Sequence, residues 1–474
     1  MLVDMPPHGL IPRGGRPRTP AQAPPSVKRE STNYYRSPAF PVNSHRHAYK
    51  LSLRHYRLSR IAPSSIQRNN RRLQRVSSFT SYERKNTLMA SPNPAPKTDA
   101  KLMELSVDRN NLLAEVAAAA RISESKVTMP ILTHLLLEAD ANGRLTITST
   151  DLQRSLTTEC PSQVKVAGKA AVQAQRFVDY LKLLAPGPVH MKALANDWLQ
   201  VNAGNSRTRM PGRAASEFPK IATPPDRAIH LSCRVLKTLV RQSLFAVCTQ
   251  EDRHALKAAQ LLLRPDRAGM VATDGHRLSF VVVPEEGIPV EGVHKSLIPR
   301  ECLVDLLSLL SATKEEGVDF AEDDKNLFFR IGFRQLGVRK LVGQFPNYEA
   351  VMPTDLPNST VIRSADLLTS IQRVLEFADA RSNGVKLHLA ENTLTISSST
   401  PDLGESEETL PVSYSNEPIT IGFNGSYLAE FLRTVGEKGA MRLSFKDSTT
   451  AGVLVPENMN LEYQQRYVVM PMRI

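Results

Sequence analysis

The chain has 474 residues, a formal net charge of +13 and 41% hydrophobic residues. That length exceeds one ordinary hydrophobic core, so we expect two to four domains. No apolar run reaches the roughly 20 residues that a membrane-spanning helix requires. The four cysteines form no Cys-x-x-Cys pair and have no histidine nearby in a metal-binding pattern, which favours inert thiols in a reduced, cytoplasmic protein.

The positive charge is concentrated at the start of the chain. Residues 1–88 hold 17 Lys and Arg against three acidic residues, whereas the remainder holds 43 against 44. The rest of the protein is therefore nearly neutral. Any contact that it makes with nucleic acid must come from an uneven distribution of charge rather than from an overall excess.

Residues 1–102 are rich in Pro, Arg and Ser and show no apolar periodicity, so we expect no packed domain there. Three interpretations compete. The segment is a disordered basic tail that binds DNA or membrane phosphates, or a transit peptide, which is also rich in Arg and Ser and poor in acids. The third is upstream sequence from a misplaced start, with Met89 or Met103 as the initiator, and we favour it.

From residue 105 onward one pattern occurs six times. A short strand with alternating apolar residues leads through a turn into a helix with apolar residues at i, i+3, i+4 and i+7. The predicted helices span 112–120, 177–184, 236–247, 303–310, 367–377 and 427–435. Asp108, Ser232, Ser364 and Asn424 precede four of these helices and could cap them.

Equivalent points of this pattern recur about every 125 residues. Asp108 and Ser232 are 124 positions apart, and Ser232 and Ser364 are 132 apart. We therefore predict three repeats of two half-units each, with boundaries at 103–225, 226–353 and 354–474. One helix and several strands per half-unit indicate an α+β fold, with helices on one face of each sheet and sheet edges that must be paired.

Residues 271–283 predict a hairpin whose turn is Thr273-Asp274-Gly275-His276. Gly275 is free to take a positive φ, and Asp274 can accept hydrogen bonds from nearby backbone. This segment, with Arg277 and Leu278, closely resembles the Thr-Asp-Gly-His-Arg-Leu segment of bacterial sliding clamps, the beta subunits of DNA polymerase III. The chain end, Tyr467 to Ile474, is similar to the Val-Met-Pro-Met-Arg-Leu terminus of that family, with Ile in place of Leu. The resemblance begins at Met103, which is why we favour the misplaced start.

The resemblance implies three tandem repeats of the DNA-clamp fold, each with two βαβββ-like halves, arranged as an arc. Two such chains would close head to tail into a ring around duplex DNA. The implied function is a DNA polymerase processivity factor in the cytoplasm, without catalytic residues, metal or cofactor. Its partners would be double-stranded DNA, a second copy of the chain, the replicative polymerase, the clamp loader and repair proteins with short clamp-binding peptides, and no membrane.

The resemblance also implies a partner-binding pocket and a set of DNA contacts. The pocket would be formed by Leu256, Thr273, Gly275, His276, Arg277, Leu278, Pro346, Val351, Val468, Met470, Pro471, Met472 and Arg473, with Met470 and Met472 in an adaptable apolar cleft and His276, Arg277 and Arg473 at its rim. The DNA contacts would be Lys126, Arg176, Lys182, Gln250, Arg253 and Arg300. For each of these six residues, a solvated surface residue is the competing interpretation.

Two other functions compete with the clamp. A β-rich scaffold that binds peptides but not DNA would be a monomer. A hydrolase could use Asp274 and His276 as an acid–base pair, although the sequence has no nucleophile motif, glycine-rich phosphate loop or metal-ligand cluster. The acidic residues Glu405, Glu407 and Glu408 are expected to lie in a solvated surface loop.

Overall fold

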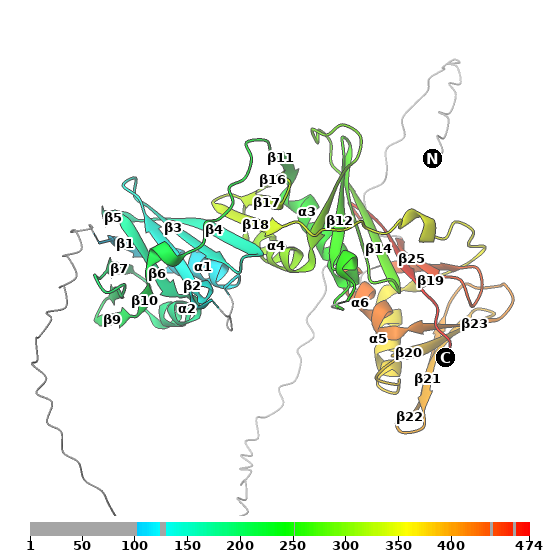
Figure 1. The fold of residues 1–474 in the computed structure, drawn as a ribbon. Coiled ribbons are helices and arrows are strands. Elements are labelled where there is room, and N and C mark those ends of the chain that lie inside the picture. The colour runs from blue at the N-terminus through cyan, green and yellow to red at the C-terminus, as the bar shows by residue number, and fades with distance from the viewer. Residues whose placement is uncertain (1–101, 124–128, 251, 437–438, 458–460) are drawn as a thin grey trace, which may run out of the picture. The chain divides into compact units, whose positions relative to one another are not determined.

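The computed structural model describes residues 102–123, 129–250, 252–436, 439–457 and 461–474. Within them, two helices and a set of antiparallel strands occur three times in succession (Figure 1). This arrangement confirms the predicted threefold α+β pattern. Lys126 and the basic segment 1–101 lie outside the described residues.

The first repeat runs from β1 to η2. Its helices are α1 (Arg109–Ala120) and α2 (Ala174–Leu183), and its 3-10 turns are η1 (Pro130–Thr133) and η2 (Ala215–Glu217). Its strands are β1 (Glu104–Asp108), β2 (His134–Ala139), β3 (Arg144–Thr150), β4 (Arg154–Pro161), β5 (Gln163–Val166), β6 (Gly168–Gln173), β7 (Pro188–Ala193), β8 (Leu199–Ala203), β9 (Ser206–Met210) and β10 (Gly212–Arg213).

The second repeat runs from β11 to β18. Its helices are α3 (Cys233–Ser243) and α4 (Arg300–Ala312), with η3 (Leu244–Ala246) and η4 (His254–Leu256). Its strands are β11 (Ile229–Ser232), β12 (Ala258–Arg264), β13 (Arg267–Thr273), β14 (Arg277–Pro284), β15 (His294–Pro299), β16 (Gly317–Glu322), β17 (Asn326–Ile331) and β18 (Arg334–Arg339). The turn η5 (Glu349–Val351) follows.

The third repeat runs from β19 to β26. Its helices are α5 (Ser364–Leu375) and α6 (Gly425–Val435). Its strands are β19 (Asn358–Arg363), β20 (Gly384–Ala390), β21 (Thr393–Thr400), β22 (Gly404–Pro411), β23 (Ile419–Asn424), β24 (Ala440–Phe445), β25 (Gly452–Glu457) and β26 (Gln464–Val469).

All six predicted helices are present, and their caps are partly as expected. Asp108 accepts from two backbone N–H groups at the start of α1, and Asn424 accepts from Tyr427 at the start of α6. Ser232 makes no side-chain capping bond. Ser364 is wrong as a cap, because it lies inside α5 and its hydroxyl donates to the carbonyl of Gly436 instead.

The sheets join the repeats to one another. Strand β4 of the first repeat pairs antiparallel with β18 of the second, which gives a nine-stranded sheet. Strand β14 of the second repeat pairs in the same way with β26 of the third, which gives an eight-stranded sheet. A five-stranded sheet ending at β9 and a four-stranded sheet ending at β22 keep free edges.

The helices pack in pairs within each repeat, α1 with α2, α3 with α4 and α5 with α6. The first helix of each pair also covers the hairpin strands β3 and β4, β13 and β14, or β21 and β22. A separate cluster of buried residues joins the second and third repeats, and it includes Leu278, Phe345, Tyr348 and Val468. None of the described helices has the length and apolar content to cross a bilayer.

The prediction of a loop at Glu405–Glu408 is wrong, because these residues belong to strand β22. An edge strand has one face toward solvent, so charged residues at alternate positions are tolerated there. Glu405 and Glu407 are exposed. Glu408 points the other way and pairs with Arg373 of α5 at 3.0 Å.

Candidate functional site

The turn between β13 and β14 is held by its own side chains. The hydroxyl of Thr273 donates to the carbonyl of Arg277 at 2.6 Å and accepts from the backbone N–H of Gly275 at 3.0 Å. Oδ1 of Asp274 accepts from the backbone N–H groups of His276 and Arg277. Gly275 has a φ of +90°, as predicted. A Cβ there would also lie 2.7 Å from the Arg253 guanidinium.

Arg277 is buried, with only 8% of its surface exposed, so its predicted position at the pocket rim is wrong. Its guanidinium donates to Oδ2 of Asp274 at 3.0 Å, to Oε2 of Glu430 at 2.6 Å and to the carbonyl of Phe245 at 2.6 Å. It also lies over the ring of Tyr427, 4.2 Å from the centroid. Glu430 belongs to α6, so Arg277 ties the turn to the third repeat.

A cavity of about 130 Å³ lies beside this turn, where the second and third repeats meet; we call it the second-junction pocket. Nine of the thirteen predicted pocket residues line it: Leu256, Thr273, Gly275, Arg277, Leu278, Pro346, Val351, Val468 and Met470. Leu278 and Val468 are directly paired across β14 and β26. The pocket is therefore mainly apolar, and the sheet pairing between repeats holds it together.

The other four predicted residues do not line the cavity. His276 is exposed, and its carbonyl accepts from the backbone N–H of Met470 at 2.9 Å. Beyond Met470 the tail, which also holds Pro471 and Arg473, runs along the third repeat, where the N–H of Met472 donates to the carbonyl of Gly422 at 2.9 Å. A strand with no Cβ at Gly422 lets the tail come this close.

The second-junction pocket is also lined by Asn347 and Tyr348, which were not among the predicted pocket residues. Tyr348 is buried and its ring lies 5.7 Å from that of Phe280. Both belong to the Phe-Pro-Asn-Tyr segment that follows the second repeat. The aromatic residue Tyr348, two positions after Pro346, was the available signal.

The described candidates for DNA contact lie in the first and second repeats. Arg176 and Lys182 are exposed on α2, and Lys182 pairs with Asp179 at 3.2 Å. Gln250 is exposed. Arg253 donates to the carbonyl of Asp274 at 2.9 Å, so part of its guanidinium supports the turn. Arg300 begins α4, and its Nε has no acceptor among the described residues.

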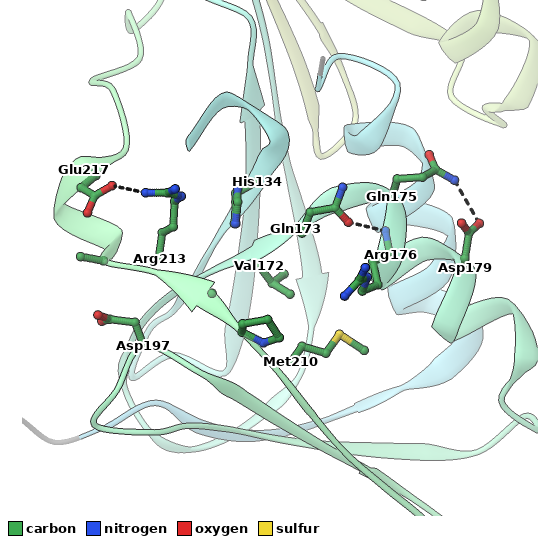
Figure 2. Close-up of a pocket in the computed structure, with 13 residues that line it drawn as sticks. His134, Val172, Gln173, Gln175, Arg176, Asp179, Asp197, Met210, Arg213 and Glu217 are labelled. Carbon is green, nitrogen blue, oxygen red and sulfur yellow. Dashed lines mark hydrogen bonds and ion pairs between the residues drawn. The ribbon is translucent and has the colours of Figure 1, made fainter. Parts of the chain in front are cut away.

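Arg176 also lines a larger open hollow in the first repeat, of about 940 Å³, which Figure 2 shows. Around this hollow, Arg213 pairs with Glu217 at 3.4 Å, and Gln173 accepts from the backbone N–H of Arg176 at 2.6 Å. His134 is nearly buried, and burial lowers its pKa. Basic and acidic side chains are mixed around this hollow, so it has no concentration of positive charge.

The geometry does not support an acid–base pair of Asp274 and His276. Both carboxylate oxygens of Asp274 already accept hydrogen bonds from the turn and from Arg277. Within the described ranges, no group of His, Cys, Asp and Glu could hold a metal ion. The cysteines are buried, and burial raises the pKa of Cys160 to about 11, so its thiol stays protonated at neutral pH.

Three family models match the chain in succession. They are the N-terminal, central and C-terminal domains of the DNA polymerase III beta subunit, over residues 103–222, 230–347 and 349–473. The matched region leaves out the basic segment at the start of the chain.

Individual relatives cover the same region. The beta sliding clamp of Proteus mirabilis is 30% identical over 375 residues, which are 78% of this chain and 100% of the relative. That of Vibrio cholerae is 28% identical with the same coverage. Among solved structures, the Pseudomonas aeruginosa sliding clamp bound to griselimycin has a TM-score of 0.73 at 26% identity, covering 79% of this chain and 100% of that one.

Proposed function

The chain belongs to the DNA polymerase III beta subunit family, whose members are non-catalytic, and on that premise we propose that it is a processivity factor. It forms a dimeric ring that encircles duplex DNA and slides on it. The ring tethers the replicative polymerase, the clamp loader and repair proteins in the cytoplasm. Short peptides of these partners bind the second-junction pocket.

The pattern of sheet edges carries the proposal of a ring. Strands β4, β14 and β22 are equivalent, because each has eight residues, follows a turn that begins at a threonine and ends in proline. Within the chain, β4 pairs with β18 and β14 pairs with β26, each in the following repeat. Strand β22 has no following repeat with which to pair. Strand β9 of the first repeat, which corresponds to β18 and β26, also has a free edge among the described residues. Pairing β22 of one chain with β9 of another supplies the missing junction.

Charge supports the same pairing. Strand β9 presents Arg207 and Arg209 on its exposed face, and β22 presents Glu405 and Glu407 on its exposed face. Opposite charges on neighbouring strands stabilise a sheet by roughly 0.2–1 kcal/mol per pair, and like charges destabilise it. Each edge therefore favours the other over a second copy of itself, which selects a head-to-tail dimer.

A closed ring stays on DNA because DNA is threaded through it. Contacts inside such a ring need only be few, directed at phosphates and independent of sequence. A body without net positive charge is suited to this. We propose Lys126, Arg176, Lys182, Gln250, Arg253 and Arg300 for these contacts, with Lys182 and Arg253 limited by the bonds that they already make.

The second-junction pocket suits a short linear peptide. Its wall is apolar on both sides of the junction, with Leu278 and Val468 in the floor and Met470 and Val351 partly exposed at the opening. A flexible methionine adapts to different side chains. Four predicted residues adjoin pocket residues in the sequence and would contact the flanks of a longer peptide: His276, Pro471, Met472 and Arg473.

Release from DNA of different topology tests the ring. The protein is loaded on a nicked circular plasmid, which is then cut once with a restriction enzyme. We expect retention on the circle and rapid loss from the linear DNA, together with a native mass of twice that of the single chain. Equal loss from both forms of DNA, or a monomeric mass, would overturn the proposal.

A further inference from the structure

The turn beside the second-junction pocket occurs a second time in the chain. Between β3 and β4, the hydroxyl of Thr150 donates to the carbonyl of Arg154 at 2.7 Å and accepts from the N–H of Leu152 at 3.0 Å. Oδ1 of Asp151 accepts from the N–H groups of Gln153 and Arg154. Nε of Arg154 donates to Oδ2 of Asp151 at 2.9 Å. Each of these bonds has its counterpart in the turn from Thr273 to Arg277.

The contacts to the next repeat correspond as well. Arg154 donates to Asp305 of α4 at 2.7 Å, as Arg277 donates to Glu430 of α6. Asp305 and Glu430 are each the sixth residue of their helix. Ser155 of β4 lies opposite Gly337 of β18. This pair occupies the position that Leu278 and Val468 have between β14 and β26.

A cavity of about 390 Å³ lies at this junction of the first and second repeats, and we call it the first-junction pocket. It is lined by the turn, by the segment Pro219–Ala222 and by residues of β17 and β18. The segment after Phe218 corresponds to the one after Phe345 in the second-junction pocket. Because Ser155 and Gly337 replace a leucine and a valine, this cavity is larger and more polar.

The lining of the first-junction pocket is basic. It includes Arg154, Lys220, Lys325 and Arg339 and no acidic residue. Arg154 is already bonded to two carboxylates, but the other three are exposed and make no ion pair within the described part of the chain. In a body with almost no net charge, such a concentration of cations selects an anionic ligand.

Leu152 points to the same site by a separate argument. It has a φ of +71°, where the equivalent residue of the other turn is Gly275. A leucine in this region of φ is strained. Burial in the core does not explain the strain, because Leu152 is 43% exposed and lines the cavity. Its side chain, with Phe328 and Val338, gives the basic cavity an apolar part.

We propose that the first-junction pocket is a second docking site, which binds an extended acidic peptide segment that carries an apolar side chain. The three free cations would contact carboxylates, and the apolar part would accept the side chain between them. A DNA backbone would use the cations but not Leu152, Phe328 and Val338, so a peptide fits the observations better. The proposal rests on the geometry of one chain and does not require the ring.

The proposed docking site is tested by fluorescence anisotropy with a labelled hexapeptide. The peptide has two central leucines with two glutamates on each side. We expect binding that weakens at least 10-fold when the glutamates are replaced by glutamine, and again at least 10-fold in the Lys220→Glu/Lys325→Glu/Arg339→Glu variant. Leu152→Gly should raise Tm, because the strain is relieved, and yet lower the affinity several-fold. If Leu152 had only a structural role, Leu152→Gly would raise Tm without lowering the affinity for the peptide.

A matched charge control is Lys295→Glu/Arg381→Glu/Lys386→Glu, whose three cations are exposed and line none of the cavities described above. Equal weakening in this variant would reduce the effect to unspecific charge attraction and overturn the proposal. The proposal would also be overturned if the Lys220→Glu/Lys325→Glu/Arg339→Glu variant lost affinity for a short DNA duplex but kept its affinity for the peptide. As a second measurement, Leu152→Cys should react with a bromoacetylated acidic peptide faster than with its glutamine version, and equal rates would contradict the site.

Discussion

The guanidinium of Arg277 donates to Asp274 in its own turn and to two more distant acceptors, Phe245 and Glu430. The sequence resemblance marks this residue as part of a binding pocket, and it does line the cavity. Its charged group, however, is directed away from a ligand and into the junction between repeats. The partner Glu430 is 153 positions away in sequence, so no local pattern could have indicated the contact.

Arg277→Ala should therefore act on stability as well as on binding. The substitution leaves the nearly buried carboxylate of Asp274 without its cation and the carbonyl of Phe245 without its donor. We expect a loss of about 3 kcal/mol in the free energy of unfolding, measured by urea denaturation. Arg473→Ala, at an exposed position of the tail, is the control and should leave stability unchanged. Equal stability of the two variants would contradict the buried role of Arg277.

His134 gives the first repeat a dependence on pH. Burial lowers its pKa from the ordinary 6.5, against the effect of its hydrogen bond to the carbonyl of Pro130. As pH falls below 6.5, the unfolded chain binds a proton that the folded chain resists, so the folded state loses stability. We expect Tm to fall between pH 7 and pH 5, and to fall less in His134→Gln. An identical pH profile in that variant would show that other groups are responsible.

Among the elements, those with a strong apolar period could be predicted from the sequence, and those shaped by distant contacts could not. The six helices and the hairpin from β13 to β14 follow from local patterns. Strand β22 was expected as a loop, because alternating acids look solvated whether or not a neighbouring strand holds them. The turn Thr150–Arg154 repeats the spacing of Thr, Asp and Arg in Thr273–Arg277, 123 positions earlier, and this was the signal for the first-junction pocket.

The C-terminal tail should be separable from the rest of the third repeat. Met470 lines the second-junction pocket, whereas the four residues that follow lie along β23. Deleting residues 470–474 should weaken binding of a partner peptide at least 10-fold and leave the dimer intact. Gly422→Ala, whose Cβ would collide with the carbonyl of Met472, should speed hydrogen exchange at Met472. Dissociation of the dimer on deletion would mean that the tail belongs to the subunit interface.

The free edge strands make a prediction about assembly. Arg207→Glu/Arg209→Glu should weaken the dimer, because like charges would then face one another across β9 and β22. Mixing this variant with Glu405→Arg/Glu407→Arg should restore dimers, and only as a heterodimer, because both of its interfaces then pair acidic with basic side chains. Sedimentation measures both outcomes. If neither variant changes the dimer, the subunits meet through other surfaces.

At the scale of the whole molecule, the two junctions within the chain share an arginine–carboxylate ion pair between repeats, which the proposed third junction lacks. Arg154 and Arg277 begin strands β4 and β14 and reach an acid in the following repeat. The first residue of β22 is Gly404, which has no side chain to do so. The equivalent acid of the first repeat, Asp179, is the sixth residue of α2, and among the described residues it bonds only to Gln175 and Lys182 of its own helix. A junction between subunits would thus be held by β9 and β22 without this tie.

The three equivalent acids allow a direct comparison. Asp305→Ala removes a carboxylate that is 7% exposed and bonded to Arg154, and should cost about 3 kcal/mol of unfolding free energy. Glu430→Ala should cost about 1 kcal/mol or less, since its side chain is 42% exposed. Asp179→Ala should change neither the stability nor the dissociation constant of the dimer, because no arginine faces it from Gly404. A weaker dimer in Asp179→Ala would mean that another group of the partner chain makes the tie, and the junctions would then be alike.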